Sequence, residues 1–138
     1  MASRGRLERG LAVLLAAMYG AAWAAPPCAA PAQAMARVEL LFGASVDGAT
    51  PVSEDAWRRF VDEEVTPRFP EGLTEFVGQG QWRRPDGSVG REASRVLLMW
   101  YTPGAGRGQD IEAIRAAYKT RFRQLSVLRV DGMDCVSF

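Results

Sequence analysis

The run SRVLLMWYT, residues 94–102, constrains the fold of this chain more than any other segment. Successive side chains of a β-strand point to opposite faces, and here both alternating sets are apolar. The two sets are Val96, Leu98 and Trp100 on one face and Leu97, Met99 and Tyr101 on the other. A strand that is apolar on both faces is typical of a position where both faces are covered. We therefore expect this run to form a central strand of a sheet.

Five further segments predict the elements around this strand. Apolar residues alternate in residues 36–44, which predicts a half-buried strand, and they recur at helical spacing in residues 54–65 and 111–122. Ser53 and Asp110 are the expected N-caps of these two helices, and the first helix must end before Pro67. The remaining strands are expected at residues 73–84, where Gly78 and Gly80 suggest a bulge or a close backbone approach, and at 126–131.

This order, β-α-β-β-α-β, predicts an α+β fold of the ferredoxin-like kind: a four-stranded antiparallel sheet with two helices on one face. We expect the central strand to turn Leu97, Met99 and Tyr101 towards the other, uncovered face. The simplest cover for that face is the same face of a second copy, giving a homodimer that resembles the dimeric α+β barrels and their small apolar cavities. The alternative is a monomer in which the N-terminal lead-in or the C-terminal segment folds over it.

The first residues have the pattern of a secretory signal peptide. Three arginines precede an apolar run from Leu11 to Trp23, which ends in the small-residue triplet 22–24. We expect cleavage after Ala24, an Ala/Pro-rich lead-in over residues 25–35 and a single domain over residues 36–138, in the periplasm or outside the cell. The alternative is a retained anchor, although the run is shorter than a spanning helix requires.

Charge and composition limit the kinds of ligand that this chain is expected to bind. Without the leader, which carries three arginines and one glutamate, the chain has a formal net charge of −1, so we expect no binding to nucleic acid. No membrane span is expected after cleavage. The chain contains no histidine, which removes the commonest general base and metal ligand, and we expect no cofactor.

The two cysteines lie at opposite ends of the expected mature chain, at Cys28 and Cys135. Export would place them in an oxidising compartment, where disulfides persist, and each has only the other as a partner. We therefore expect a Cys28–Cys135 disulfide. The alternative is lipid modification of Cys28, which the preceding prolines disfavour.

Several motifs resemble a known family. They are VTPRFPEGLT (65–74), GQGQW (78–82), REASRVLLMWY (91–101), AAYKTRFRQLSVLRV (116–130) and CVSF (135–138). Together they resemble the bacterial domain-of-unknown-function family 3574, found in small exported proteins, over Val38 to Phe138. The resemblance implies a cysteine after the leader and another near the end, but it implies no activity, substrate or catalytic residue.

Two local features are candidate ligand sites. The loop GAGRG, residues 104–108, lies between a strand and a helix, but its spacing matches no phosphate-binding motif and Asp110 would repel phosphate. The acidic run 62–64 lacks the regular spacing of a cation-binding loop, and Glu64 has Arg68 as a possible partner. We interpret the first as a plain loop and the second as a solvated face, with no metal site.

The remaining candidates gather around the second hairpin and the second helix. Tyr118, Arg91 and Glu92 are the candidate catalytic residues, since Tyr or Glu in an apolar cavity can transfer protons and Arg can orient a carboxylate. The candidate ligand-binding residues are Gln81, Trp82, Leu97, Met99, Tyr101, Arg68 and Lys119. A structural alternative places Trp82 and Tyr118 in the core and makes Arg91 and Glu92 a surface pair.

The leading hypothesis is an exported domain, not an enzyme, whose sheet face binds a small apolar or amphipathic molecule or an envelope protein. The alternative is a cofactor-free enzyme of the dimeric α+β barrel kind. A purely structural role is the third.

Overall fold

The computed structural model describes residues 28–46 and 49–138 and shows an α+β fold with a four-stranded sheet, a small two-stranded sheet and two α-helices. The expected signal peptide and its cleavage site lie outside these residues. The elements are β1 (Gln33–Gly43), β2 (Ser45–Val46), β3 (Thr50–Pro51), α1 (Glu54–Phe60), the π-helical turn η1 (Val61–Val65), β4 (Thr74–Arg83), β5 (Val89–Tyr101), α2 (Arg107–Phe122) and β6 (Leu128–Val136).

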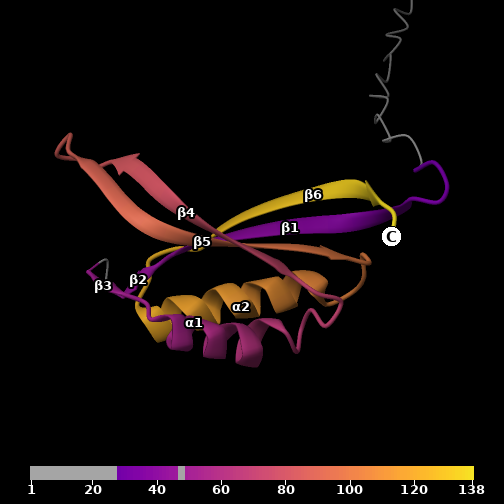
Figure 1. Ribbon diagram of the computed structural model, residues 1–138, viewed down its shortest axis with the longest axis horizontal. Helices are drawn as coiled ribbons and strands as arrows, with labels where there is room; N and C mark the ends of the chain where they lie inside the picture. Colours follow the sequence, from indigo (N-terminus) through magenta and orange to yellow (C-terminus); the bar gives the residue numbers. More distant parts are fainter. Residues whose placement is uncertain (1–27, 47–48) are drawn as a thin grey trace, which may run out of the picture.

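The main sheet has the strand order β4-β5-β1-β6, with every neighbouring pair antiparallel. This is the predicted ferredoxin-like arrangement, and β2 and β3 add a separate small hairpin after β1. Both helices lie against one face, and no described element covers the other (Figure 1). The β4–β5 hairpin and the β1–β6 pair extend in opposite directions beyond the helices.

The core lies between the helices and the covered face of the sheet. The predicted apolar stripes supply most of it. The buried residues are alternate β1 residues from Val38 to Phe42, Trp57 and Phe60 of α1, and Ile111, Ile114, Tyr118 and Phe122 of α2. Phe42 makes edge contacts with Trp57, Phe60 and Tyr118 at ring-centroid distances of 5.2, 5.9 and 4.6 Å. Edge-to-face contacts of this kind add to the stabilisation that burial alone provides.

Several element boundaries differ from expectation. β1 begins at Gln33, because the lead-in continues into the ladder with β6, and α2 begins at Arg107 with Gly106 as N-cap in place of Asp110. The β4–β5 pairing runs without interruption from Thr74 to Arg83, so no bulge forms at the glycines. Ser53 does cap α1, where its hydroxyl accepts a hydrogen bond from the Ala56 amide at 3.2 Å.

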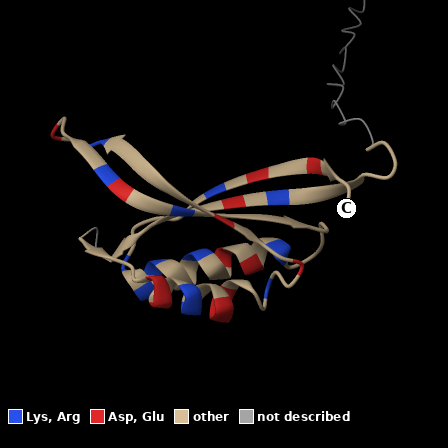
Figure 2. Ribbon diagram, viewed as in Figure 1, with Lys and Arg blue, Asp and Glu red and all other residues tan. Residues whose placement is uncertain are grey.

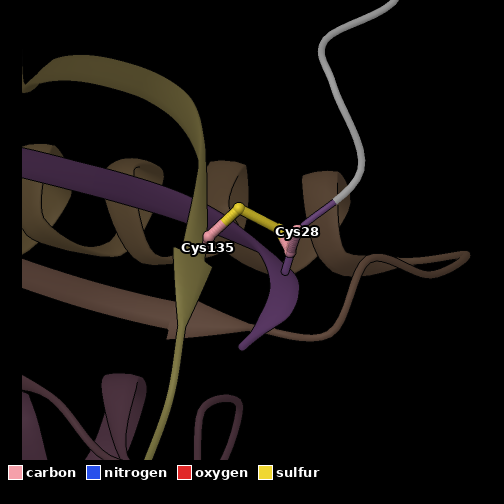
Figure 3. The surroundings of a disulfide bond; sticks show 2 residues. All are labelled: Cys28 and Cys135. Carbon is pink, nitrogen blue, oxygen red and sulfur yellow. A yellow bond between two sulfur atoms is a disulfide. The ribbon is translucent and has the colours of Figure 1, made fainter. Parts of the chain in front are cut away.

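A disulfide joins Cys28 to Cys135, with the two Cα atoms 5.5 Å apart (Figure 3). Cys135 lies in β6 opposite Ala34 of β1, and the chain turns back between Cys28 and Gln33 to meet it. The bridge therefore ties the start of the described chain to its last strand, as predicted. It also occupies the Cys28 sulfur, which excludes the lipidated alternative for this bridged form.

Candidate functional site

The uncovered face of the sheet is apolar across its centre. Val96 of β5 is flanked by Phe76 of β4 and Leu41 of β1, and Phe76 is 52% exposed. We call this surface the open-face patch; its members are Leu41, Phe76, Val96, Leu98, Trp100, Leu128 and Val130. The ion pair between Arg37 and Glu39 of β1 interrupts the patch, because Glu39 lies between Leu98 and Val130. Exposed apolar side chains gathered on one face are uncommon on monomers and mark surfaces that bind something.

The prediction that Leu97, Met99 and Tyr101 lie on the uncovered face is wrong. These side chains are buried under the helices, because Leu97 and Met99 pair with the inward-facing Leu40 and Val38 of β1. The other alternating set of β5 therefore faces outward. Since both sets are apolar, only the register with β1 distinguishes them.

A groove of about 710 Å³ adjoins the open-face patch, where β1 and β5 meet the connector between α2 and β6. Its volume is within the range of small-molecule sites. Its lining residues are Leu41, Gly43, Trp82, Glu92, Arg123, Gln124, Leu125, Ser126 and Leu128. Leucines from three segments and the indole of Trp82 make the groove largely apolar, while Glu92 and Arg123 each bring a charged group to it.

A network of hydrogen bonds holds the Glu92 carboxylate in place. The buried Ser45 hydroxyl donates to Glu92 Oε1, and the Gln124 side-chain amide donates to the Ser45 carbonyl. Gly43 leaves room for both side chains: a Cβ there would lie 2.9 Å from Glu92 Oε1 and 3.0 Å from Gln124 Oε1. The glycine, the serine and the glutamine were missed in the sequence, because 47 and 79 residues separate Ser45 from its two partners.

Tyr118, a candidate catalytic residue, lies beneath this network and not in the groove. Its ring is fully buried among Phe42, Phe60 and Phe122, and its hydroxyl donates to the Gly43 carbonyl at 2.7 Å. Burial raises the pKa of the Tyr118 hydroxyl well above its usual range, so the phenol stays protonated at ordinary pH. Tyr118 thus supports the floor of the groove, as the core alternative proposed.

The other candidates on the β4–β5 hairpin lie on two different faces of the sheet, because successive side chains of a strand alternate. Trp82 lies on the open face at 46% exposure, where its ring packs across Gly90, and is not a core residue. Arg91 and Gln81 alternate to the opposite face of the hairpin, where the Arg91 guanidinium donates to the Gln81 side chain at 3.0 Å. Arg91 and Glu92 therefore do not form a pair.

Arg68 and Lys119 also lie away from the groove. Arg68 forms the predicted ion pair with Glu64 at 3.1 Å, at the end of η1. Lys119 is exposed near the end of α2. Figure 2 shows basic and acidic residues interleaved over both helices, which fits a solvated surface.

A second hollow, of about 250 Å³, lies at the other end of the open face. Leu98 and Trp100 of β5 line it together with Phe138 at the chain's end. The Trp100 indole donates to Asp134 at 2.8 Å, and Asp134 also pairs with Arg37 at 2.9 Å. The Trp100 indole N–H, Asp134 and Arg37 thus satisfy one another, and Leu98, Phe138 and the Trp100 ring remain as apolar surface for contact.

Two arginines have structural roles that the sequence did not indicate. Arg95 lies under the helices, 7% exposed, paired with Glu54 and Glu75 and stacked on Trp57 at 5.1 Å. Burial alone would lower the pKa of Arg95, but the hydrogen bonds that its guanidinium donates to Glu75 and Glu54 outweigh burial and raise the pKa.

Arg107, at the Gly-rich loop, donates to the Arg68 carbonyl at 2.7 Å and pairs with Glu71. It therefore anchors the connector after η1 and is not directed to a phosphate.

Within the described residues, no three His, Cys, Asp or Glu side chains gather as a metal site would require. The helices there also lack the length and hydrophobicity needed to cross a bilayer.

Two solved structures share the fold. Both are of a phage SAM lyase: one, in complex with S-methyl-5′-thioadenosine, aligns with a TM-score of 0.57 at 11% identity over 75% of this chain and 90% of that one. The other, in the apo state, aligns with a TM-score of 0.55 at 13% identity over 76% of this chain and 89% of that one. At this identity the likeness shows the fold alone.

No curated protein matches the sequence. A family described as protein of unknown function (DUF3574) matches residues 37–138, from within β1 to beyond the end of β6. The resemblance found in the sequence motifs is thereby confirmed, and this chain belongs to the DUF3574 family.

Proposed function

We propose that this protein binds a small apolar or amphipathic molecule on the open-face patch and in the adjoining groove. One observation carries the proposal: a face of the sheet with aromatic and branched side chains at its centre has no described element over it. A ligand that covers this face removes apolar surface from water, at about 25 cal/mol per Å².

A second copy is the proposed cover for the rest of the face. A four-stranded face with eight-residue strands measures about 19 Å by 26 Å, or about 500 Å². A standard interface takes about 800 Å² from each partner, which the projecting β4–β5 hairpin and the chain end near Phe138 help to supply. Two sheets packed in this way would enclose the groove between them.

We further propose that the protein works outside the cytoplasm, in the periplasm or beyond the cell. The Cys28–Cys135 disulfide supports this proposal, because such bonds persist in oxidising compartments.

A matched pair of lysine substitutions tests the binding surface. Val96→Lys places a charge at the centre of the open face, whereas Val77→Lys places one on β4 at a valine that is 71% exposed on the opposite side. With the neutral dye N-phenyl-1-naphthylamine, wild type and Val77→Lys should show saturable fluorescence enhancement. Val96→Lys should bind the dye at least tenfold more weakly.

Light scattering on the same three proteins tests the dimer, which only Val96→Lys should disrupt. Equal dye binding by wild type and both variants would overturn the proposed face. A dimer that binds no dye would favour a protein ligand, such as an envelope protein, over a small molecule.

A cofactor-free enzyme is the second candidate, and the position of Glu92 favours it. Of the three candidate catalytic residues, only Glu92 reaches the groove, where it could accept a proton from a bound substrate. Incubation with SAM, followed by mass spectrometry for S-methyl-5′-thioadenosine, tests the chemistry of the proteins that share the fold. Product that forms with wild type and is lost in Glu92→Gln would support this candidate, and absence of product would remove that substrate.

A further inference from the structure

Glu92 differs from the other glutamates of the described chain in its partners. Each of the others forms an ion pair with an arginine; they are Glu39, Glu54, Glu63, Glu64, Glu71, Glu75 and Glu112. Glu92 forms no such pair with any described residue and accepts its hydrogen bond from the neutral Ser45 hydroxyl. It is also half-buried, in a groove.

A half-buried carboxylate without a cationic partner is costly unless something supplies the positive charge. The surroundings of Glu92 indicate what kind of cation fits. Gly80 lies opposite it on β4, and Trp82 lies diagonally beyond, so no bulky side chain stands directly beside the carboxylate on its β4 side. On the β1 side, the Gln124 side chain lies next to it over Gly43. Leu41 and Leu128 continue the groove as an apolar wall.

Two arginines lie near this wall. Arg84 stacks on the Trp82 ring at 5.8 Å and donates to the Val89 carbonyl at 3.1 Å. Arg123 lines the groove and has interactions of its own. Among the described residues that line the groove, Glu92 is the one acidic residue. It therefore has no second carboxylate there with which to chelate a metal.

We propose that the groove binds an organic cation, an ammonium group with an apolar body, with Glu92 as its counter-ion. The ammonium group lies against the Glu92 carboxylate, and the apolar body lies along Leu41, Leu128 and the exposed surface of Trp82. This inference rests on the proposed function and names the chemical class of its ligand.

Three probes of equal chain length test the charge preference: octyltrimethylammonium, 1-octanol and octanoate, each titrated calorimetrically into the full chain. Wild type should bind octyltrimethylammonium about tenfold more tightly than 1-octanol, and octanoate more weakly than either. Glu92→Gln keeps the shape and the hydrogen bond from Ser45 but removes the charge. It should lower affinity for the cation about tenfold and leave 1-octanol unchanged.

Glu63→Gln is the matched control, because Glu63 is 53% exposed on η1, on the helix side of the molecule. It should bind all three probes as wild type does. Cation binding no tighter than 1-octanol binding, or equal losses in both glutamine variants, would overturn the assignment while leaving the apolar surface intact. If none of the three probes binds wild type, the proposed function fails as well.

Discussion

At the scale of single residues, the absence of a Cβ at Gly43 matters most. It lies at the end of β1, where the Glu92 and Gln124 side chains converge over it and the Tyr118 hydroxyl binds its carbonyl. Any side chain here competes with the network that positions Glu92.

Gly43→Ala should therefore lower the free energy of unfolding by about 1–2 kcal/mol, because the added Cβ forces polar atoms from contact distances of about 3 Å. Urea unfolding followed by circular dichroism measures this change. Gly104→Ala is the control, because its Cβ would meet nothing within 4 Å. If both variants are as stable as wild type, Gly43 does not hold this network open.

The residues that line each face of β5, and the partners of Glu92, could not be predicted from the sequence. The alternation in residues 94–102 shows two apolar sets, and no local pattern says which of them the helices cover. The answer lies in the register, which pairs Leu97 with Leu40 and Arg95 with Phe42. The hydrogen bonds from Ser45 to Glu92 and from Gln124 to Ser45 likewise depend on pairing distant segments, which a single sequence does not reveal.

At the scale of elements, α2 and β6 are joined by a network of charges on the surface. Glu112 of α2 pairs with Arg115 at 2.7 Å and with Arg129 of β6 at 2.9 Å, and Arg129 also pairs with Asp131 at 2.8 Å. Hydrogen bonds from Arg115 and Arg129 hold the pKa of the Glu112 carboxyl below its usual range.

This shift predicts a small dependence of stability on pH. Because the pKa of Glu112 is lower in the folded state, its contribution is present above the ordinary glutamate pKa and is lost as pH falls through the folded value. Glu112→Gln should cost a few tenths of a kcal/mol at pH 7, since the group is exposed and screened by solvent, and nothing at pH 2. Urea unfolding of both proteins at the two pH values measures the difference. A gap that stays constant or grows towards low pH would contradict the assignment.

The type and order of the main elements were predictable because their periodic patterns are local. The stripe from Ile111 to Phe122 and the alternation from Val38 to Phe42 needed no tertiary information. Their ends were not predictable: α2 begins four residues before Ile111, where Gly106 adopts a left-handed conformation. β5 extends back to Val89, since pairing with β4 continues through polar residues that show no pattern.

At the scale of the whole molecule, the disulfide closes almost the entire described chain into a loop. The two cysteines are 107 residues apart. In the chain-entropy account, closing a loop of that length lowers the entropy of the unfolded chain and raises the free energy of unfolding by about 4–5 kcal/mol. The double variant Cys28→Ser, Cys135→Ser should therefore unfold at a markedly lower urea concentration, with a stability loss approaching this value. A loss below about 1 kcal/mol would mean that strand pairing between β1 and β6 already restricts the unfolded chain.

The most direct test of the account is ¹⁹F NMR of protein labelled with 5-fluorotryptophan, titrated with N-phenyl-1-naphthylamine. Trp82 and Trp100 lie on the open face, whereas Trp57 is buried under the helices at 2% exposure and serves as an internal control. Single Trp→Phe variants assign the resonances. If the open face is the binding surface, the Trp82 and Trp100 resonances shift saturably and that of Trp57 does not. Shifts confined to Trp57, or no shift at either open-face tryptophan while the dye binds, would contradict the account.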